Sequence, residues 1–168
     1  MHKYRFAIIR NEDPYDHQSW IDACEDYKAK VEYKIIDITR NNWLETIIAY
    51  KPDYCLLKPS AKTTLFRNLY QERVDILANK LGLNVFPFYK EVELYENKRY
   101  FSYWAKANSI PHPKTFVFYH KEEADKFAIN TAYPIVAKLN VGASGNGVSI
   151  LKTKKEALNY IHETFQKG

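Results

Sequence analysis

The sequence of 168 residues is poor in the residue types that mark several classes of protein. It holds two cysteines, five glycines and seven prolines, too few for a disulfide framework, a collagen-like repeat or a low-complexity chain. It has no apolar run of about 18 residues, so it offers no transmembrane helix. The apolar run near its start, FAII, is too short for a secretory signal, and we therefore expect a cytoplasmic protein.

The first part of the chain has no net charge, whereas the second part is basic. Residues 1–95 carry 14 basic and 14 acidic side chains, whereas residues 96–168 carry 11 basic and 6 acidic ones. The whole formal charge of +5 therefore lies in the second part. We accordingly expect an anionic partner to bind residues 96–168. The five histidines show no metal-ligand spacing, so we expect no metal site on them.

The first 88 residues alternate between short apolar runs and segments with helical periodicity. We predict strands over 5–10, 32–38, 54–57 and 83–88, with helices between them. This alternation predicts an α/β fold with a small parallel sheet, in which sites form at the carboxyl ends of strands. Arg10 and Lys58 stand at two such ends, where a substrate carboxylate or phosphate could bind. Solvent-facing strand ends explain them equally well.

The pattern changes after this alternation. The polar stretch 89–96 is typical of a linker, and the chain then shows α+β character. We predict helices over 97–108 and 121–129, strands over 115–119, 135–139 and 148–151, and a last helix through 165. The boundary predicts two domains, 1–95 and 96–168.

The most distinctive stretch runs from Lys138 to Gly147, KLNVGASGNG. Glycines let backbone N–H groups converge on an anion with no Cβ in the way, and Lys138 adds a full positive charge. The stretch is chemically suited to polyphosphate, although its spacing matches neither a P-loop nor a dinucleotide fingerprint. A glycine-rich hairpin without a ligand is the alternative.

The order of motifs from Asn97 onward resembles the ATP-grasp ligase superfamily. The sequence reads NK at a helix start, then IPHPKT, then YPIVAK, and then the glycine-rich loop ending in GV, across about seventy residues. The first 88 residues resemble the Rossmann-like domain that precedes the grasp in these enzymes. The resemblance implies a preATP-grasp domain over 1–95 and the N-terminal lobe of an ATP-grasp domain over 96–168.

The resemblance also implies roles for individual residues. Lys98 would lie near the α-phosphate of ATP, and Lys138 would bridge the α- and β-phosphates. The flexible loop would close over the outer phosphates, and comprises Gly142, Ala143, Ser144, Gly145, Asn146 and Gly147. The alternatives are a solvated lysine at the start of a helix for Lys98 and a solvated strand-end charge for Lys138.

The family pattern is only half present. Its second lobe, with the adenine hinge and the Mg²⁺ ligands, finds no counterpart in 148–168, so we expect an inactive piece of a longer enzyme. The parent enzyme would use ATP and Mg²⁺ to join a small carboxylate to an amine or thiol through an acyl phosphate. A non-catalytic nucleotide-binding module and an α/β interaction domain are the alternatives. We expect no nucleic acid or membrane partner, and an oligomer is possible.

Overall fold

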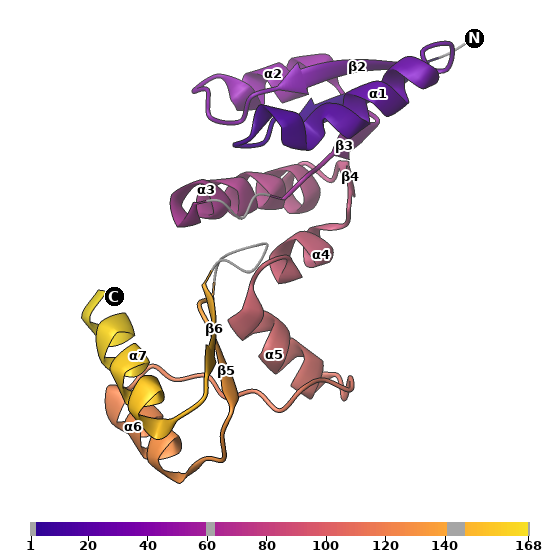
Figure 1. Cartoon of the computed structure of the whole chain (residues 1–168). Helices are drawn as coiled ribbons and strands as arrows, with labels where there is room; N and C mark the ends of the chain where they lie inside the picture. Colours follow the sequence, from indigo (N-terminus) through magenta and orange to yellow (C-terminus); the bar gives the residue numbers. More distant parts are fainter. Residues whose placement is uncertain (1–2, 60–62, 141–146, 168) are drawn as a thin grey trace. The chain divides into compact units, whose positions relative to one another are not determined.

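The computed structural model describes residues 3–59, 63–140 and 147–167, and the chain divides into two compact units, Met1–Tyr95 and Glu96–Gly168. Each unit is described by itself, and both are drawn in Figure 1. The chain has mixed α/β structure, as the sequence predicts. No helix of the described ranges is both long enough and apolar enough to cross a membrane.

The first unit contains a four-stranded parallel sheet in the order β2-β1-β3-β4. Its strands are β1 (Tyr4–Ile9), β2 (Val31–Ile36), β3 (Tyr54–Leu56) and β4 (Asn84–Phe86), all within the predicted runs or one residue beyond them. Alternate residues of β1 enter different cores: Ile8 packs with Cys24 on one face, and Ala7 and Ile9 join a larger cluster on the other. The parallel sheet expected from the sequence is therefore confirmed.

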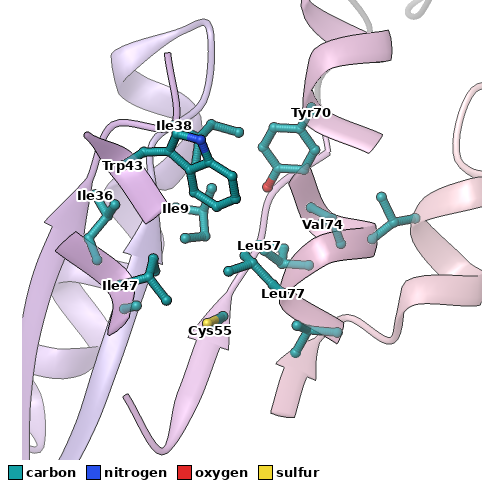
Figure 2. Close-up of a cluster of buried hydrophobic side chains, with 13 residues drawn as sticks. Ile9, Ile36, Ile38, Trp43, Ile47, Cys55, Leu57, Tyr70, Val74 and Leu77 are labelled. Atoms are coloured by element: carbon teal, nitrogen blue, oxygen red, sulfur yellow. The ribbon is translucent and has the colours of Figure 1, made fainter. Parts of the chain in front are cut away.

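Helices cover both faces of this sheet. A 3-10 turn, η1 (Pro14–His17), leads into α1 (Gln18–Asp26), which packs on one face. The helices α2 (Trp43–Tyr50), α3 (Thr64–Asp75) with its π-helical extension η2 (Ile76–Lys80), and α4 (Tyr89–Leu94) contribute to the larger cluster on the other face. Figure 2 shows this cluster, in which Trp43 and Tyr70 lie above the aliphatic side chains of the sheet.

The predicted linker over 89–96 was wrong, because most of it forms α4. The backbone N–H of Phe88 donates to Glu91 Oε2 at 2.8 Å, which pairs an N–H group before the first turn. Val92 is buried in the larger cluster of the first unit. A carboxylate at the helix start and the packing of Val92 and Tyr89 on the core thus favour a helix in this polar segment.

The second unit consists of a two-stranded antiparallel hairpin and three helices. The hairpin is β5 (Ile135–Lys138) and β6 (Val148–Leu151), and the helices are α5 (Lys98–Ala107), α6 (Lys121–Asn130) and α7 (Lys154–Lys167). Ala128 of α6, Leu151 of β6 and Ala157 of α7 form the buried core. Figure 1 shows α6 and α7 side by side next to the hairpin, in agreement with this core.

The predicted strand over 115–119 was wrong, since no ladder is assigned there. A strand needs a partner for its backbone groups, and this segment instead packs through its aromatic side chains. The rings of Phe116 and Phe118 lie 4.7 and 5.3 Å from the ring of Phe127 on α6, measured between centroids. Aromatic and β-branched residues favour strands, but they do not by themselves supply the partner strand.

Candidate functional site

The first turn of α5 carries Lys98, and its backbone donors are paired in an unusual way. The first N–H groups of a helix have no partner within the helix. Asn97 caps one of them, because its Oδ1 accepts from the N–H of Tyr100 at 3.3 Å. Asn140 supplies two more acceptors: its Oδ1 accepts from Arg99 N at 2.9 Å, and its backbone oxygen from Lys98 N at 3.4 Å. The start of α5 is thus tied to the end of β5.

The side chain of Lys98 already has a carboxylate partner. Its Nζ lies 2.8 Å from Glu96 Oε2, and both side chains are about one-quarter exposed. Glu96 itself has a φ of 49°, in the left-handed region that non-glycine residues seldom adopt. The ammonium is therefore held near the helix start rather than extended into solvent, and an anionic ligand would have to compete with Glu96.

Lys138 is the last residue of β5 and lies on the open face of the hairpin. Ile135 and Ala137 turn toward the α6–α7 core, so Val136 and Lys138 face the other way. Cross-strand partners share a face, and the partners of these two residues are Ile150 and Val148. Val136 and Ile150 are 57% and 64% exposed, so the cation stands beside an uncovered apolar surface.

Gly147 is the one residue of the predicted phosphate loop that the structure describes. Its carbonyl accepts from Leu139 N at 2.8 Å, and its φ is +74°. A Cβ at this position would lie 3.0 Å from Leu139 Cβ, closer than side chains normally approach. The backbone conformation and the neighbouring side chain therefore both favour glycine here. Gly142, Ala143, Ser144, Gly145 and Asn146 lie outside the described residues.

The hydrogen bonds from the first turn of α5 to Asn140 bring the backbone at Lys98 near the end of β5, which Lys138 forms. Lys138 is two residues before Asn140, whose backbone and side chain bind the first turn of α5. Two residues span at most about 7 Å. The amide donors of that turn are taken by asparagines, so an anion would meet the lysine side chains rather than the helix amides, and lysines suit phosphate as point charges. Asn140 was not predicted, because its partners lie about forty residues away.

A second group of polar residues gathers at the carboxyl ends of β1 and β3. Ile8 and Leu56 are register partners, and Arg10 and Lys58 each follow two residues later. The buried Asn11 joins the two ends, because its Nδ2 donates to Lys58 O at 2.7 Å and to Asp16 Oδ2 at 3.1 Å. This is the point in the sheet where the strand order reverses, which is where ligands bind in open α/β sheets.

His17 belongs to this second group and was not predicted. It is 6% exposed, and its Nδ1 has no hydrogen-bond partner among the described residues. Burial and the nearby charge of Arg10 lower its pKa, and Asp16 opposes them only in part. A neutral imidazole therefore lies at the edge of the sheet. Only its burial beside the end of a strand distinguishes His17 from the other histidines, and the periodicity of the sequence does not predict that burial.

The acidic groups at this edge are all engaged. Arg10 Nη1 lies 2.9 Å from Asp37 Oδ2. Burial raises the pKa of Asp37, but hydrogen bonds from Thr39 and the charges of Arg10 and Arg40 outweigh it and lower the pKa. Glu12 accepts from the hydroxyl of Thr63, the N-cap of α3, at 2.5 Å. Within the described ranges, no three His, Cys, Asp or Glu residues gather as metal ligands.

Comparison with known proteins gives a fold but no close relative. No family profile and no curated protein matches the sequence. The biotin carboxylase domain of the Hydrogenobacter thermophilus 2-oxoglutarate carboxylase, solved with MgADP, ADP and bicarbonate, matches with a TM-score of 0.70 at 15% identity, over 99% of this chain and 42% of that one. A RimK domain ATP-grasp protein from Sphaerobacter thermophilus matches with a TM-score of 0.66 at 15% identity, over 98% and 60%.

A third solved structure agrees with these two. N5-carboxyaminoimidazole ribonucleotide synthetase from Thermotoga maritima matches with a TM-score of 0.57 at 18% identity, over 93% of this chain and 43% of that one. The chain therefore spans between 42% and 60% of the length of these structures. Likeness at such low identity establishes the fold alone.

Proposed function

Because the chain has an ATP-grasp superfamily fold, we propose that it carries part of the ATP site of a ligase that joins a carboxylate to an amine or thiol. Residues 1–95 would be the preATP-grasp domain, and residues 96–168 the first lobe of the ATP-grasp domain. The solved structures that match are longer than this chain, so the activity of the whole enzyme belongs to the proposal.

One observation carries this proposal. The start of α5, with Lys98, is hydrogen-bonded to Asn140, two residues beyond Lys138. The backbones at two lysines forty positions apart in the sequence thereby come near each other, which supports the proposal that both side chains reach one ligand. A single phosphate can be bound by one cation, but a polyphosphate is favoured where two cations lie within reach of it. The local chemistry therefore fits a nucleoside triphosphate better than a monophosphate.

The proposed reaction has two steps. A carboxylate oxygen attacks the γ-phosphorus, the bond from that phosphorus to the β–γ bridging oxygen breaks, and ADP leaves with the electron pair. The amine or thiol then attacks the acyl carbon, phosphate leaves, and the nucleophile loses its proton. Catalysis of phosphoryl transfer is mostly positioning and neutralisation of charge. Lys98 would neutralise charge near the α-phosphate, and Lys138 would neutralise charge on the α- and β-phosphates.

Mg²⁺ does not fit the described residues as they stand. Hard divalent cations need several oxygen ligands, and the described ranges contain no grouping of three acidic or other metal-ligating residues. We therefore derive no step through Mg²⁺ from this chain, and the proposed enzyme would hold it with other residues. Arg10 and Lys58 stay proposed contacts for the anionic substrate, at the switch point of the sheet.

The test of the proposed function is a titration followed by amide NMR, which detects weak binding. We expect ATP to shift the resonances around Lys98 and Lys138 at lower concentration than AMP does. A single-stranded oligonucleotide at matched ionic strength serves as the control for general attraction to the basic second unit. Equal affinity for ATP and AMP would contradict the proposal. Oligonucleotide binding that falls steeply with salt would instead indicate a nucleic-acid binder.

A further inference from the structure

Asn140 accepts hydrogen bonds from backbone N–H groups at the amino-terminal end of α5, although it does not belong to that helix. Among the first three N–H groups of α5, Asn97 accepts from one and Asn140 from the other two. A normal N-cap residue immediately precedes its helix, whereas Asn140 lies 41 residues after Arg99. The hydrogen bond therefore fixes the position of one element against another, in addition to capping a helix.

Among the described residues, the start of α5 makes another long-range side-chain contact, in which the Arg99 guanidinium lies 5.5 Å from the centroid of the Tyr119 ring. Tyr100, Phe101 and Tyr103 are all more than 40% exposed, and only Ser102 and Ala105 of the helix are buried. These two small side chains bury little apolar area, so they fix the first turn only weakly. Polar contacts at the helix start consequently matter more here than they would in a helix with a large apolar face.

We propose that Asn140 is the positioning residue that sets the separation between Lys98 and Lys138. The inference rests on the proposed function, in which both lysines bind one nucleotide. Asn140 touches neither ligand nor reacting atoms in this account. It acts by holding the first turn of α5 beside the end of β5, so that both ammonium groups reach the same polyphosphate.

A consequence for specificity follows from the pairing of the helix donors. Helix starts commonly bind phosphate through their free N–H groups, but the asparagines occupy those of α5. In this account, recognition of the phosphates then depends on two ammonium groups, one on α5 and one at the end of β5. A ligand that needs both, such as ATP, is sensitive to their separation, whereas AMP can be bound by one of them. Loss of Asn140 should therefore reduce the preference for ATP over AMP.

The matched variants are Asn140→Ala and Asn108→Ala. Asn108 is the C-cap residue at the opposite end of the same helix, and its Nδ2 donates to Trp104 O at 2.8 Å. Both changes remove one asparagine amide from a terminus of α5, but only the first removes a hydrogen bond between the helix and the residues that follow β5. A third variant, Asn140→Asp, keeps an oxygen that can accept from Arg99 N.

Amide hydrogen exchange and nucleotide titration together give the readouts. We expect Asn140→Ala to speed exchange at Arg99, whose acceptor is removed, and Asn140→Asp to restore protection. We expect Asn140→Ala to weaken ATP binding about tenfold, the equivalent of one charge-assisted hydrogen bond, with AMP nearly unchanged. Asn108→Ala should leave the ATP to AMP ratio as it is in the unaltered protein.

The outcomes separate this inference from the function on which it rests. If the unaltered protein does not prefer ATP to AMP, the proposed function fails and the role of Asn140 fails with it. If the unaltered protein prefers ATP and Asn140→Ala keeps that preference, only the positioning role is overturned, whatever the exchange rates show. Protection of the α6 and α7 amides in each variant confirms that the second unit still folds.

Discussion

Glu96 is the residue that most directly opposes an anion at Lys98. Its carboxylate lies 2.8 Å from the lysine Nζ in a partly exposed pair, and such pairs contribute about 0.2–1 kcal/mol. We predict that Glu96→Gln tightens ATP binding, by up to about fivefold, because the phosphate no longer competes for the ammonium. Isothermal titration checks this. Weaker ATP binding in the variant would instead mean that Glu96 orients the lysine for its ligand.

His17 should make stability depend on pH. Its pKa is lowered in the folded chain, so the unfolded chain binds more protons near the ordinary value of about 6.5. The free energy of unfolding then rises with pH up to about 6.5, above which the contribution of His17 is fully present. It falls as the pH drops below that value. We predict that His17→Gln flattens this slope between about pH 5 and 7 in urea unfolding. An unchanged slope would show that His17 titrates normally.

Individual residues were predictable where their chemistry is local. Lys98 was expected at the start of a helix and Lys138 at the end of a strand, and the structure has them there. Asn140 and His17 were missed for a physical reason. The first acts through a backbone 41 residues away, and the second is distinguished only by its burial.

At the scale of elements, the N-cap of α3 can be tested by a single substitution. Thr63 Oγ1 accepts from Phe66 N at 3.3 Å and donates to Glu12 Oε1 at 2.5 Å. We predict that Thr63→Ala lowers the free energy of unfolding by about 1 kcal/mol. The neighbouring Thr64→Ala, at an exposed position inside the first turn, should have almost no effect. Equal losses in the two variants would contradict the assignment of the cap.

The turn of the β5–β6 hairpin gives a second test at this scale. Gly147 and Gly82 both have positive φ, but only at Gly147 would a Cβ meet another residue, Leu139, within 3.0 Å. Alanine pays about 1–2 kcal/mol for the backbone at either position. We predict a larger loss of stability for Gly147→Ala than for Gly82→Ala, measured by chemical unfolding. Equal losses would show that the turn relaxes around the new methyl group.

Helices and strands were predictable where a single residue pattern in the sequence favours them. Apolar runs predicted all four strands of the parallel sheet, including the edge strands β2 and β4, which keep exposed residues beside their buried ones. The segment 115–119 has the same composition but no partner strand, and pairing is a property of the whole unit. The helix α4 has one capping carboxylate and two side chains on the core, Val92 and Tyr89, and so short a pattern is easily interpreted as a linker.

At the scale of the whole molecule, the order of weak motifs was more informative than any one of them. Matches at 15% and 18% identity carry no recognisable sequence likeness over most of the chain, yet the fold is that of ATP-grasp proteins, as the resemblance predicted. The site residues themselves stay a prediction. A fold is common to many activities, so function has to be argued from the site.

We also expect that a destabilising substitution in the core of one compact unit leaves the stability of the other unit unchanged. Leu77 is fully buried in the larger cluster of the first unit. We predict that Leu77→Ala destabilises the amides of that unit by about 2–5 kcal/mol and leaves exchange in α6 and α7 unchanged. Equal loss of protection in both units would show that the chain unfolds as a single cooperative body.

The central claim is that Lys98 and Lys138 bind one polyphosphate, and a double-mutant cycle of ATP affinity tests it most directly. The variants are Lys98→Gln, Lys138→Gln and their combination, with Lys106→Gln on the same helix and Lys152→Gln after β6 as controls. We predict that each single change at the site weakens ATP binding about tenfold, that their effects are not additive, and that the controls bind as the unaltered protein does. ATP affinity that is unchanged in the combined variant would contradict the account.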